Sequence, residues 1–231
     1  MKKTIYIALI LTFISSCGCE RNAKPVEVKA NSELISISKK IESQFPVQEV
    51  PNQDNVDTRY EYTDDNGNSV IVENSYPRGG QVYTAPKGER YIYAVFWTRI
   101  TNNTTDSLML TIEFLEEYQL PSSPDRVFKL LIPTDTLAID KEISTNYGLD
   151  LERYLNGHLY EQNDLKKIIK PNDCNGFYVV TLFNKGVEGT LRTGLTIEKD
   201  KILYRVNDKA IDCGRINLKK LKEKKPAHNK G

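Results

Sequence analysis

Cysteine and histidine are the residues of this chain best suited to nucleophilic or metal chemistry, and both are scarce. The 231 residues include four cysteines and two histidines. Cys17 and Cys19 stand one residue apart, but no further cysteine or histidine follows nearby to complete a zinc or dithiol site. His158 and His228 are far apart, and no G-x-S-x-G sequence marks a nucleophile. The sequence therefore predicts no catalytic residue, no metal site and no cofactor.

The residues before Cys17 follow the order of an export signal. Two lysines precede an almost wholly apolar run over residues 5–14, and two serines follow it. The run is too short to span a bilayer as a permanent helix. We therefore expect residues 1–16 to be a cleaved signal peptide.

The sequence "ISSC" at residues 14–17 resembles the bacterial lipobox, in which an aliphatic residue and two small residues precede the lipidated cysteine. The resemblance implies cleavage before Cys17, a diacylglycerol on its sulfur and an acyl chain on its new amino group. Several chains hold a protein firmly on a membrane, because each buried methylene contributes about 0.8 kcal/mol. The other interpretation is an ordinary cleaved signal followed by two incidental cysteines.

Charge and proline content divide the rest of the chain. Residues 17–56 are polar and contain three prolines, which predicts a tether, with apolar residues at helical spacing within residues 31–45. Residues 215–231 carry a net charge of +6 and form a basic tail, which would contact anionic lipid or the protein's own acidic face, or simply be solvated. We expect one folded domain over residues 57–214, and nothing in its composition indicates nucleic-acid binding.

The first part of this domain has the period-two pattern of strands. Asn66-Gly67 lies between two such runs and predicts a β-hairpin with a type I′ turn. The same residues imitate a calcium loop with Asp64, Asn66 and Glu73 at ligand positions, but Tyr62 replaces its first aspartate. The flanking strands also differ from the helices of that loop, so we favour the hairpin.

Two long strands follow, and their apolar faces predict the core. Alternate residues on each strand share one face: Ile92, Ala94, Phe96 and Ile100 on the first, Leu108, Leu110, Ile112 and Phe114 on the second. Residues 147–157 and 163–170 are expected to form short helical crossovers, and further strand-like runs follow. This pattern predicts a mainly β fold, an antiparallel β-sandwich with one or two short helices.

The stretch "FWTRITNNTTDSLMLTIEF" at residues 96–114 resembles a strand pair of immunoglobulin-like modules in bacterial cell-envelope proteins. More loosely, the whole chain is similar to uncharacterised lipoproteins of Bacteroidota. These resemblances imply an immunoglobulin-like sandwich held on an outer membrane by lipid, facing the periplasm or the cell surface. A single acidic residue near the lipidated cysteine, Glu20, favours the periplasm-facing orientation.

Three groups of residues are candidates for other roles. Cys174 and Cys213 would form a disulfide if they meet, since export exposes them to oxidation, or else remain two separate thiols. Another group, on the strand face opposite Phe96, is a candidate binding face for a glycan or an envelope protein, unless the tether helix or the "LERYL" segment covers it as a second core. It consists of Tyr91, Tyr93, Trp97 and Arg99.

The third group carries modification rather than binding. Ser107 and Thr136 follow aspartates in tripeptides that resemble O-glycosylation acceptors of Bacteroidota. Together the observations predict a lipid-anchored envelope protein with a binding, structural or accessory role. The alternative is a carbohydrate-binding module or a carbohydrate-acting enzyme with paired carboxylates, which need not be close in sequence.

Replacing Cys17 tests the lipid anchor. We expect Cys17→Ser to remain unprocessed and to lose incorporation of a radiolabelled fatty acid, because serine has no thiol to carry the diacylglycerol. Cys19→Ser is the matched control and should label normally. Normal labelling of Cys17→Ser would show that the anchor interpretation is wrong.

Overall fold

The computed structural model describes residues 55–115, 117–135, 137, 144–161, 163–218 and 222–224. Cys17, the helix expected within residues 31–45, and Thr136 lie outside these residues.

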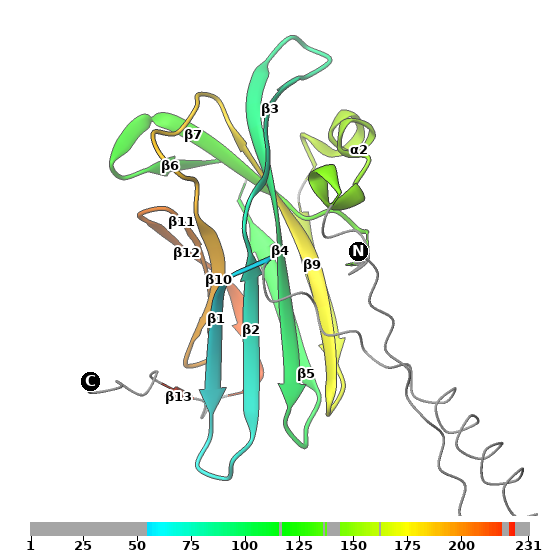
Figure 1. Cartoon of the computed structure of the whole chain (residues 1–231), viewed down its shortest axis with the longest axis vertical. Coiled ribbons are helices and arrows are strands. Elements are labelled where there is room, and N and C mark those ends of the chain that lie inside the picture. Colours follow the sequence, from blue (N-terminus) through cyan, green and yellow to red (C-terminus); the bar gives the residue numbers. More distant parts are fainter. Residues whose placement is uncertain are drawn as a thin grey trace, which may run out of the picture. The chain divides into compact units, whose positions relative to one another are not determined.

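Antiparallel strands of the described residues form two sheets, as the sequence predicts. The eight-stranded sheet has the order β13 (Lys222–Glu223), β1 (Val56–Thr63), β2 (Ser69–Ser75), β4 (Arg90–Asn103), β9 (Asp173–Phe183), β7 (Ser123–Leu131) and β6 (Tyr118–Leu120), and β3 (Arg78–Thr84) also pairs with β4. The five-stranded sheet has the order β10 (Thr193–Glu198), β11 (Lys201–Val206), β12 (Lys209–Ile216), β5 (Leu108–Phe114) and β8 (Asn163–Ile169). The sheets pack face to face as a β-sandwich (Figure 1).

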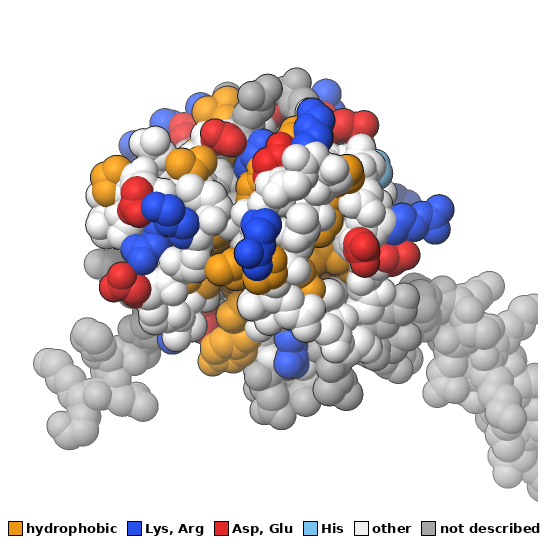
Figure 2. Space-filling view, turned by 90° about the horizontal axis from the view of Figure 1, so that it is seen from above, with side chains coloured by type: hydrophobic (Ala, Val, Ile, Leu, Met, Phe, Trp, Pro, Cys, Tyr) orange, Lys and Arg blue, Asp and Glu red, His pale blue; other side chains and the backbone are white. Residues whose placement is uncertain are grey.

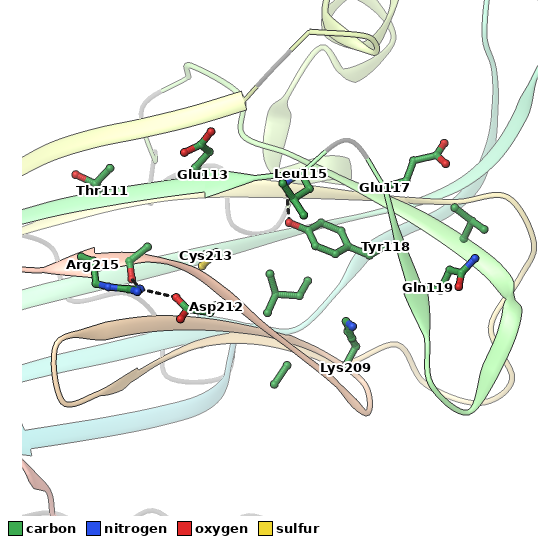
Figure 3. A pocket seen from close by; sticks show the side chains of 14 residues that line it. Thr111, Glu113, Leu115, Glu117, Tyr118, Gln119, Lys209, Asp212, Cys213 and Arg215 are labelled. Carbon is green, nitrogen blue, oxygen red and sulfur yellow. Dashed lines mark hydrogen bonds and ion pairs between the residues drawn. The ribbon is translucent and has the colours of Figure 1, made fainter.

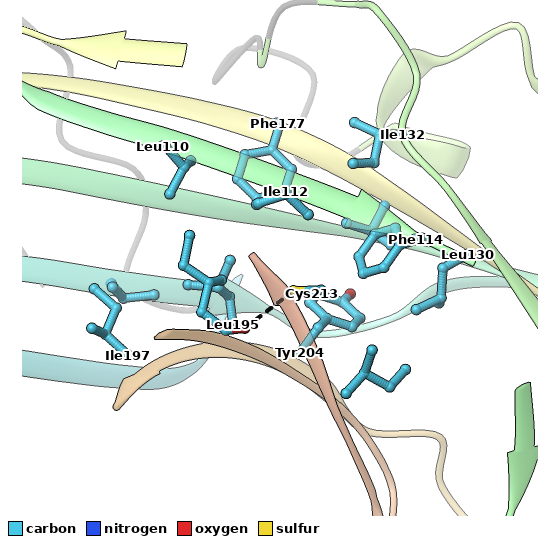
Figure 4. Close-up of a cluster of buried hydrophobic side chains, with 14 of the residues drawn as sticks. Leu110, Ile112, Phe114, Leu130, Ile132, Phe177, Leu195, Ile197, Tyr204 and Cys213 are labelled. Carbon is cyan, nitrogen blue, oxygen red and sulfur yellow. Dashed lines mark hydrogen bonds between the residues drawn. The ribbon is translucent and has the colours of Figure 1, made fainter. Parts of the chain in front are cut away.

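The main core lies between the two sheets, where alternate residues of each strand point inward (Figure 4). On β5 the pattern is regular: Leu108, Leu110, Ile112 and Phe114 are at most 3% exposed, while the residues between them are exposed. Tyr204 of β11, which β12 separates from β5 in the same sheet, packs edge-on against Phe114 and is fully buried. The predicted apolar face of this strand is therefore confirmed.

A second core covers the outer face of the eight-stranded sheet. The helix α2 (Leu151–His158) and the short 3₁₀ helix η3 (Thr145–Gly148) pack there against β3, β4 and β9 (Figure 1). Asp150 begins α2 by accepting a hydrogen bond from the backbone N–H of Arg153. The buried side chains of the helix, Leu151 and Leu155, face the sheet. The helix that the sequence predicts within residues 147–157 is thus present and ends one residue later, at His158.

Two other local predictions are corrected by the structure. Residues 163–170 were expected to be helical because Asp164 stands near the start of the segment, where an aspartate can cap a helix, but they form the edge strand β8, paired with β5 over seven residues. Long-range pairing overrides the local pattern here. The basic tail expected from residue 215 also contributes structure, because β12 ends at Ile216 and β13 pairs with β1.

The β1–β2 hairpin is confirmed, but its turn is longer than the predicted type I′ turn. Thr63 pairs with Ser69, and of the residues between them only Gly67 has a positive φ. The Asp64 carboxylate accepts hydrogen bonds from the backbone N–H groups of Asn66 and Asn68 at 2.9 Å and from the Asn68 side chain at 2.8 Å. Both carboxylate oxygens of Asp64 therefore accept hydrogen bonds within the turn, and these bonds lower the pKa of Asp64.

Side chains of the eight-stranded sheet bind the open edge of the other sheet. The buried Asn74 amide accepts from the backbone N–H of Leu195 at 2.8 Å and donates to its carbonyl at 3.1 Å. Its remaining bonds are to the hydroxyls of Thr58 and Thr98. The Asn74 side chain therefore makes the two hydrogen bonds to Leu195 that a residue of a neighbouring antiparallel strand would make.

Two contacts of β1 reinforce this link. The Tyr62 hydroxyl accepts from the backbone N–H of Ile197 at 2.9 Å, and its burial raises the pKa of the phenol to about 12. Nearer the start of β1, Asp57 pairs with Arg192 at 2.7 Å. In this way β1 of one sheet is joined to the edge strand β10 of the other, and to Arg192 just before β10.

We expect Asn74→Ala to lower the free energy of unfolding by about 2–5 kcal/mol, because it leaves the buried N–H and carbonyl of Leu195 without partners. Urea unfolding, followed by the fluorescence of the single tryptophan, measures this loss. Asn103→Ala is the matched control: Asn103 is exposed, its side chain bonds only Ser69, and its loss should cost less than about 0.5 kcal/mol. Equal losses in the two variants would contradict the role of Asn74.

Candidate functional site

A large groove begins where β12 and β5 separate. The two strands pair only over Leu110–Ile112 and Gly214–Ile216. At this junction no residue with a side chain can replace Gly214, because a Cβ there would lie 1.9 Å from the carbonyl oxygen of Thr111. A β-bulge precedes it, since the register against β11 shifts between Asp212 and Gly214. Bulges bend a strand, so β12 turns away from β5.

Beyond the junction the groove has two walls and a floor (Figure 3). One wall is β12 from Lys209 to Asp212, and the other is the end of β5 with the segment that leads into β6. Tyr118, Ile211 and Cys213 provide largely buried lining, and the volume is about 1090 Å³. This size accommodates a ligand of several residues or several rings.

A hydrogen bond between two hairpin tips marks the far end of the groove. The backbone N–H of Ser122, in the β6–β7 turn, donates to the Asp208 carboxylate, in the β11–β12 turn, at 2.8 Å. The junction of Gly214 with Ile112 marks the other end. The two walls are therefore joined at both ends of the groove.

Charges of both signs surround the groove. Asp212 bonds Arg215 and also Lys201 at 3.0 Å, and both cations lower the pKa of its carboxyl. Glu117 pairs with Lys129 at 3.6 Å, and Glu113 lies on the same wall. On the face of the molecule seen from above, acidic, basic and hydrophobic side chains are interspersed (Figure 2).

The groove's thiol and phenol are unsuited to act as nucleophiles. Burial raises the pKa of Cys213 to about 12, and its Sγ lies 3.5 Å from the carbonyl oxygen of Ile202. A thiol with this pKa is protonated at neutral pH and unreactive. Burial also raises the pKa of Tyr118, whose hydroxyl accepts from the backbone N–H of Leu115 at 2.7 Å. The groove can bind and position a ligand and exclude water from it. Neither the Cys213 thiol nor the Tyr118 phenol is suited to attack such a ligand.

Most of the predicted binding face is buried, which corrects the expectation of an exposed aromatic stripe. Trp97 is 0% and Tyr93 is 7% exposed, and the residues of η3 and α2 belong to the same buried cluster. Arg99 is 9% exposed and binds Glu73, with a 2.8 Å bond from its Nε. Tyr91 is half-buried against the same cluster. The alternative, a second core covered by the "LERYL" segment, is correct.

The predicted disulfide is also absent, because both described cysteines are free. Cys213 belongs to the core between the sheets. Cys174 pairs with Thr101 in the eight-stranded sheet. By the alternation of strands it lies on the same outer face as Arg99 and Gly176, opposite the core between the sheets. Since the sheet lies between the two sulfur atoms, they cannot meet without unfolding it.

The remaining candidates are placed as follows. Ser107 is exposed in the turn between β4 and β5, where an acceptor for modification is accessible. His158 lies on α2, where its Nδ1 contacts the Tyr154 carbonyl at 2.9 Å, away from the groove. No group of three or more His, Cys, Asp or Glu side chains among the described residues is arranged to hold a metal ion.

Sequence reasoning missed the groove because its walls come from strands about ninety residues apart in the chain. The one local signal was Gly214, since an isolated glycine in a strand often marks a bulge or a close backbone approach. Family models, curated proteins and solved structures were each searched without a match to this chain. Among the described residues, the helices are too short or too polar to span a membrane.

We expect Trp97→Ala to lower the free energy of unfolding by about 3–5 kcal/mol, because it leaves a large cavity in a packed cluster. Chemical unfolding followed by circular dichroism measures the change. Trp97→Phe is the matched control and should cost less, since it keeps a ring and the buried indole Nε1 has no hydrogen-bond partner to lose. An unchanged stability of Trp97→Ala would restore Trp97 as a binding residue.

Proposed function

We propose that this protein is a lipid-anchored binding module of a bacterial cell envelope and that its ligand occupies the groove between β12 and β6. The export signal and the lipobox at Cys17 support the location. The single observation that carries the binding role is the groove itself, which is large, open and bounded at both ends by contacts between its walls.

The anchor and the tether fit this role. Lipidation at Cys17 would hold the chain on the outer membrane, facing the periplasm, and about forty residues separate that cysteine from β1. A polar, proline-containing tether lets an anchored module search for a ligand near the membrane. The ligand is then an envelope protein or a glycan, and the domain works as a structural or accessory part of a larger assembly.

The carbohydrate-acting alternative rests on the carboxylates of the same groove. Glu113, Glu117 and Asp212 all line it, and glycoside hydrolysis uses a pair of carboxyl groups. Of these, Asp212 is held ionised by Arg215 and Lys201, so it suits a base or nucleophile but not a proton donor. Hydrolysis of oligosaccharides that is lost in Glu113→Gln and in Asp212→Asn would favour this alternative over binding.

Photo-crosslinking in living cells tests the binding role. A benzoylphenylalanine at Gln119, on the groove wall, should yield one dominant adduct that mass spectrometry identifies. The control position is Lys166, which is exposed on the edge strand β8 and does not line the groove. Adducts of equal yield at both positions, or none at Gln119, would contradict binding through the groove.

A further inference from the structure

The wall of the groove on β12 presents unpaired backbone groups. Asn207 and Asp208 form a two-residue turn between β11 and β12, so Val206 and Lys209 exchange the first hydrogen bonds of the ladder. Antiparallel ladders alternate, and the backbone groups of Ala210 and Asp212 therefore point away from β11. That direction is the groove, and no described strand pairs with them there.

The opposite wall presents the same chemistry on β6. Val127 of β7 uses its N–H and its carbonyl on Asn184, at 3.0 Å each, so these groups point away from β6. Gln119 is the partner of Val127 in the β6–β7 ladder. In such a pair the backbone groups of both residues point outward. The N–H and the carbonyl of Gln119 therefore face the groove across from β12.

Two other strand edges of the described structure are covered by groups of the fold itself. The edge of β10 is bound by Asn74 and Tyr62, and the edge of β1 is paired by β13. Uncovered edges attract other strands, and proteins normally protect them. The edges of β12 and β6 are not covered in this way, and they face each other across one groove.

We propose that the groove accepts an extended peptide segment of another envelope protein, which adds a strand alongside β12. This inference rests on the proposed binding function and names the class of its ligand. A strand rises about 3.3 Å per residue, so the wall from Lys209 to Asp212 spans about four residues of such a peptide. Backbone hydrogen bonds supply affinity in this mode, and side chains at alternate positions supply specificity.

The side chains around the groove define the peptide's sequence pattern. Inward-facing residues of the added strand would contact Tyr118, Ile211 and Cys213, so they should be apolar. Outward-facing residues would lie between Lys209 on one wall and Glu117 on the other. Charge complementarity therefore favours a segment that alternates apolar residues with acidic and basic ones.

Selection from a displayed library of random twelve-residue peptides, with the mature full chain as target, supplies the probe. We expect enriched sequences with apolar residues at alternate positions. Ala210→Pro should weaken the best peptide at least about tenfold, because it removes an N–H that faces the groove and places a ring there. Lys166→Pro is the matched control. Lys166 pairs with Thr111, and the carbonyl of Thr111 faces β12 on the other side. In such a pair the backbone groups of both residues point outward, so the N–H of Lys166 points to solvent.

Methylation of the peptide's backbone nitrogens separates strand addition from side-chain binding. Methyl groups at alternate nitrogens should each weaken binding about tenfold or more, and those between them about twofold or less. Amide hydrogen exchange at Ala210, Asp212 and Gln119 should slow when the peptide binds. Both Pro variants are first checked for an unchanged circular dichroism spectrum, and the methylation pattern stands even if Ala210→Pro fails to fold.

Three results would overturn the strand proposal: no enriched sequence, equal loss at all methylated positions, or unchanged exchange at these amides. A dominant adduct at Gln119 in cells together with any of them would keep the binding function and remove the strand mode. Absence of that adduct would remove the binding function itself.

Discussion

The buried amide of Asn74 holds the two sheets together in a way that apolar packing alone does not. Its four hydrogen bonds reach Thr58, Thr98 and both backbone groups of Leu195, so one side chain joins β1, β2 and β4 to the edge of the other sheet. Apolar contacts between sheets are tolerant of sliding, whereas these bonds fix one register. The positions of β10, β11 and β12 relative to the eight-stranded sheet follow from that register, and so does the groove beside β12.

The elements that local patterns specify were predictable. The alternation on β5 and the helix after Asp150 depend on neighbours within a few residues, and both are confirmed. The error at β8 has a physical cause: Leu165, Ile168 and Ile169 fit a helical stripe equally well, and only the pairing with β5 decides between the two. Propensity without a partner strand cannot resolve such a case.

The candidate site was less predictable than the fold. Aromatic residues on β4 mark a face, but the sequence alone does not say whether that face is covered, and η3 and α2 cover it. Conversely, the groove has no motif, because its hydrogen-bonding groups belong to the backbone and its walls are brought together by long-range pairing. Backbone chemistry carries no residue signature, so only register and topology reveal which groups are left open.

The contacts of β1 would have a mechanical consequence if the chain is anchored as proposed. Tension on the chain before Val56 would enter the domain through β1, which would separate from β2 one hydrogen bond at a time if nothing else held it. Asp57 and Tyr62 bind Arg192 and Ile197 near the two ends of β1, so the load passes at once into the second sheet. Resistance to pulling depends on the rate of unfolding rather than on equilibrium stability. A pulling force between the proposed anchor and a ligand bound in the groove would therefore be distributed over both sheets.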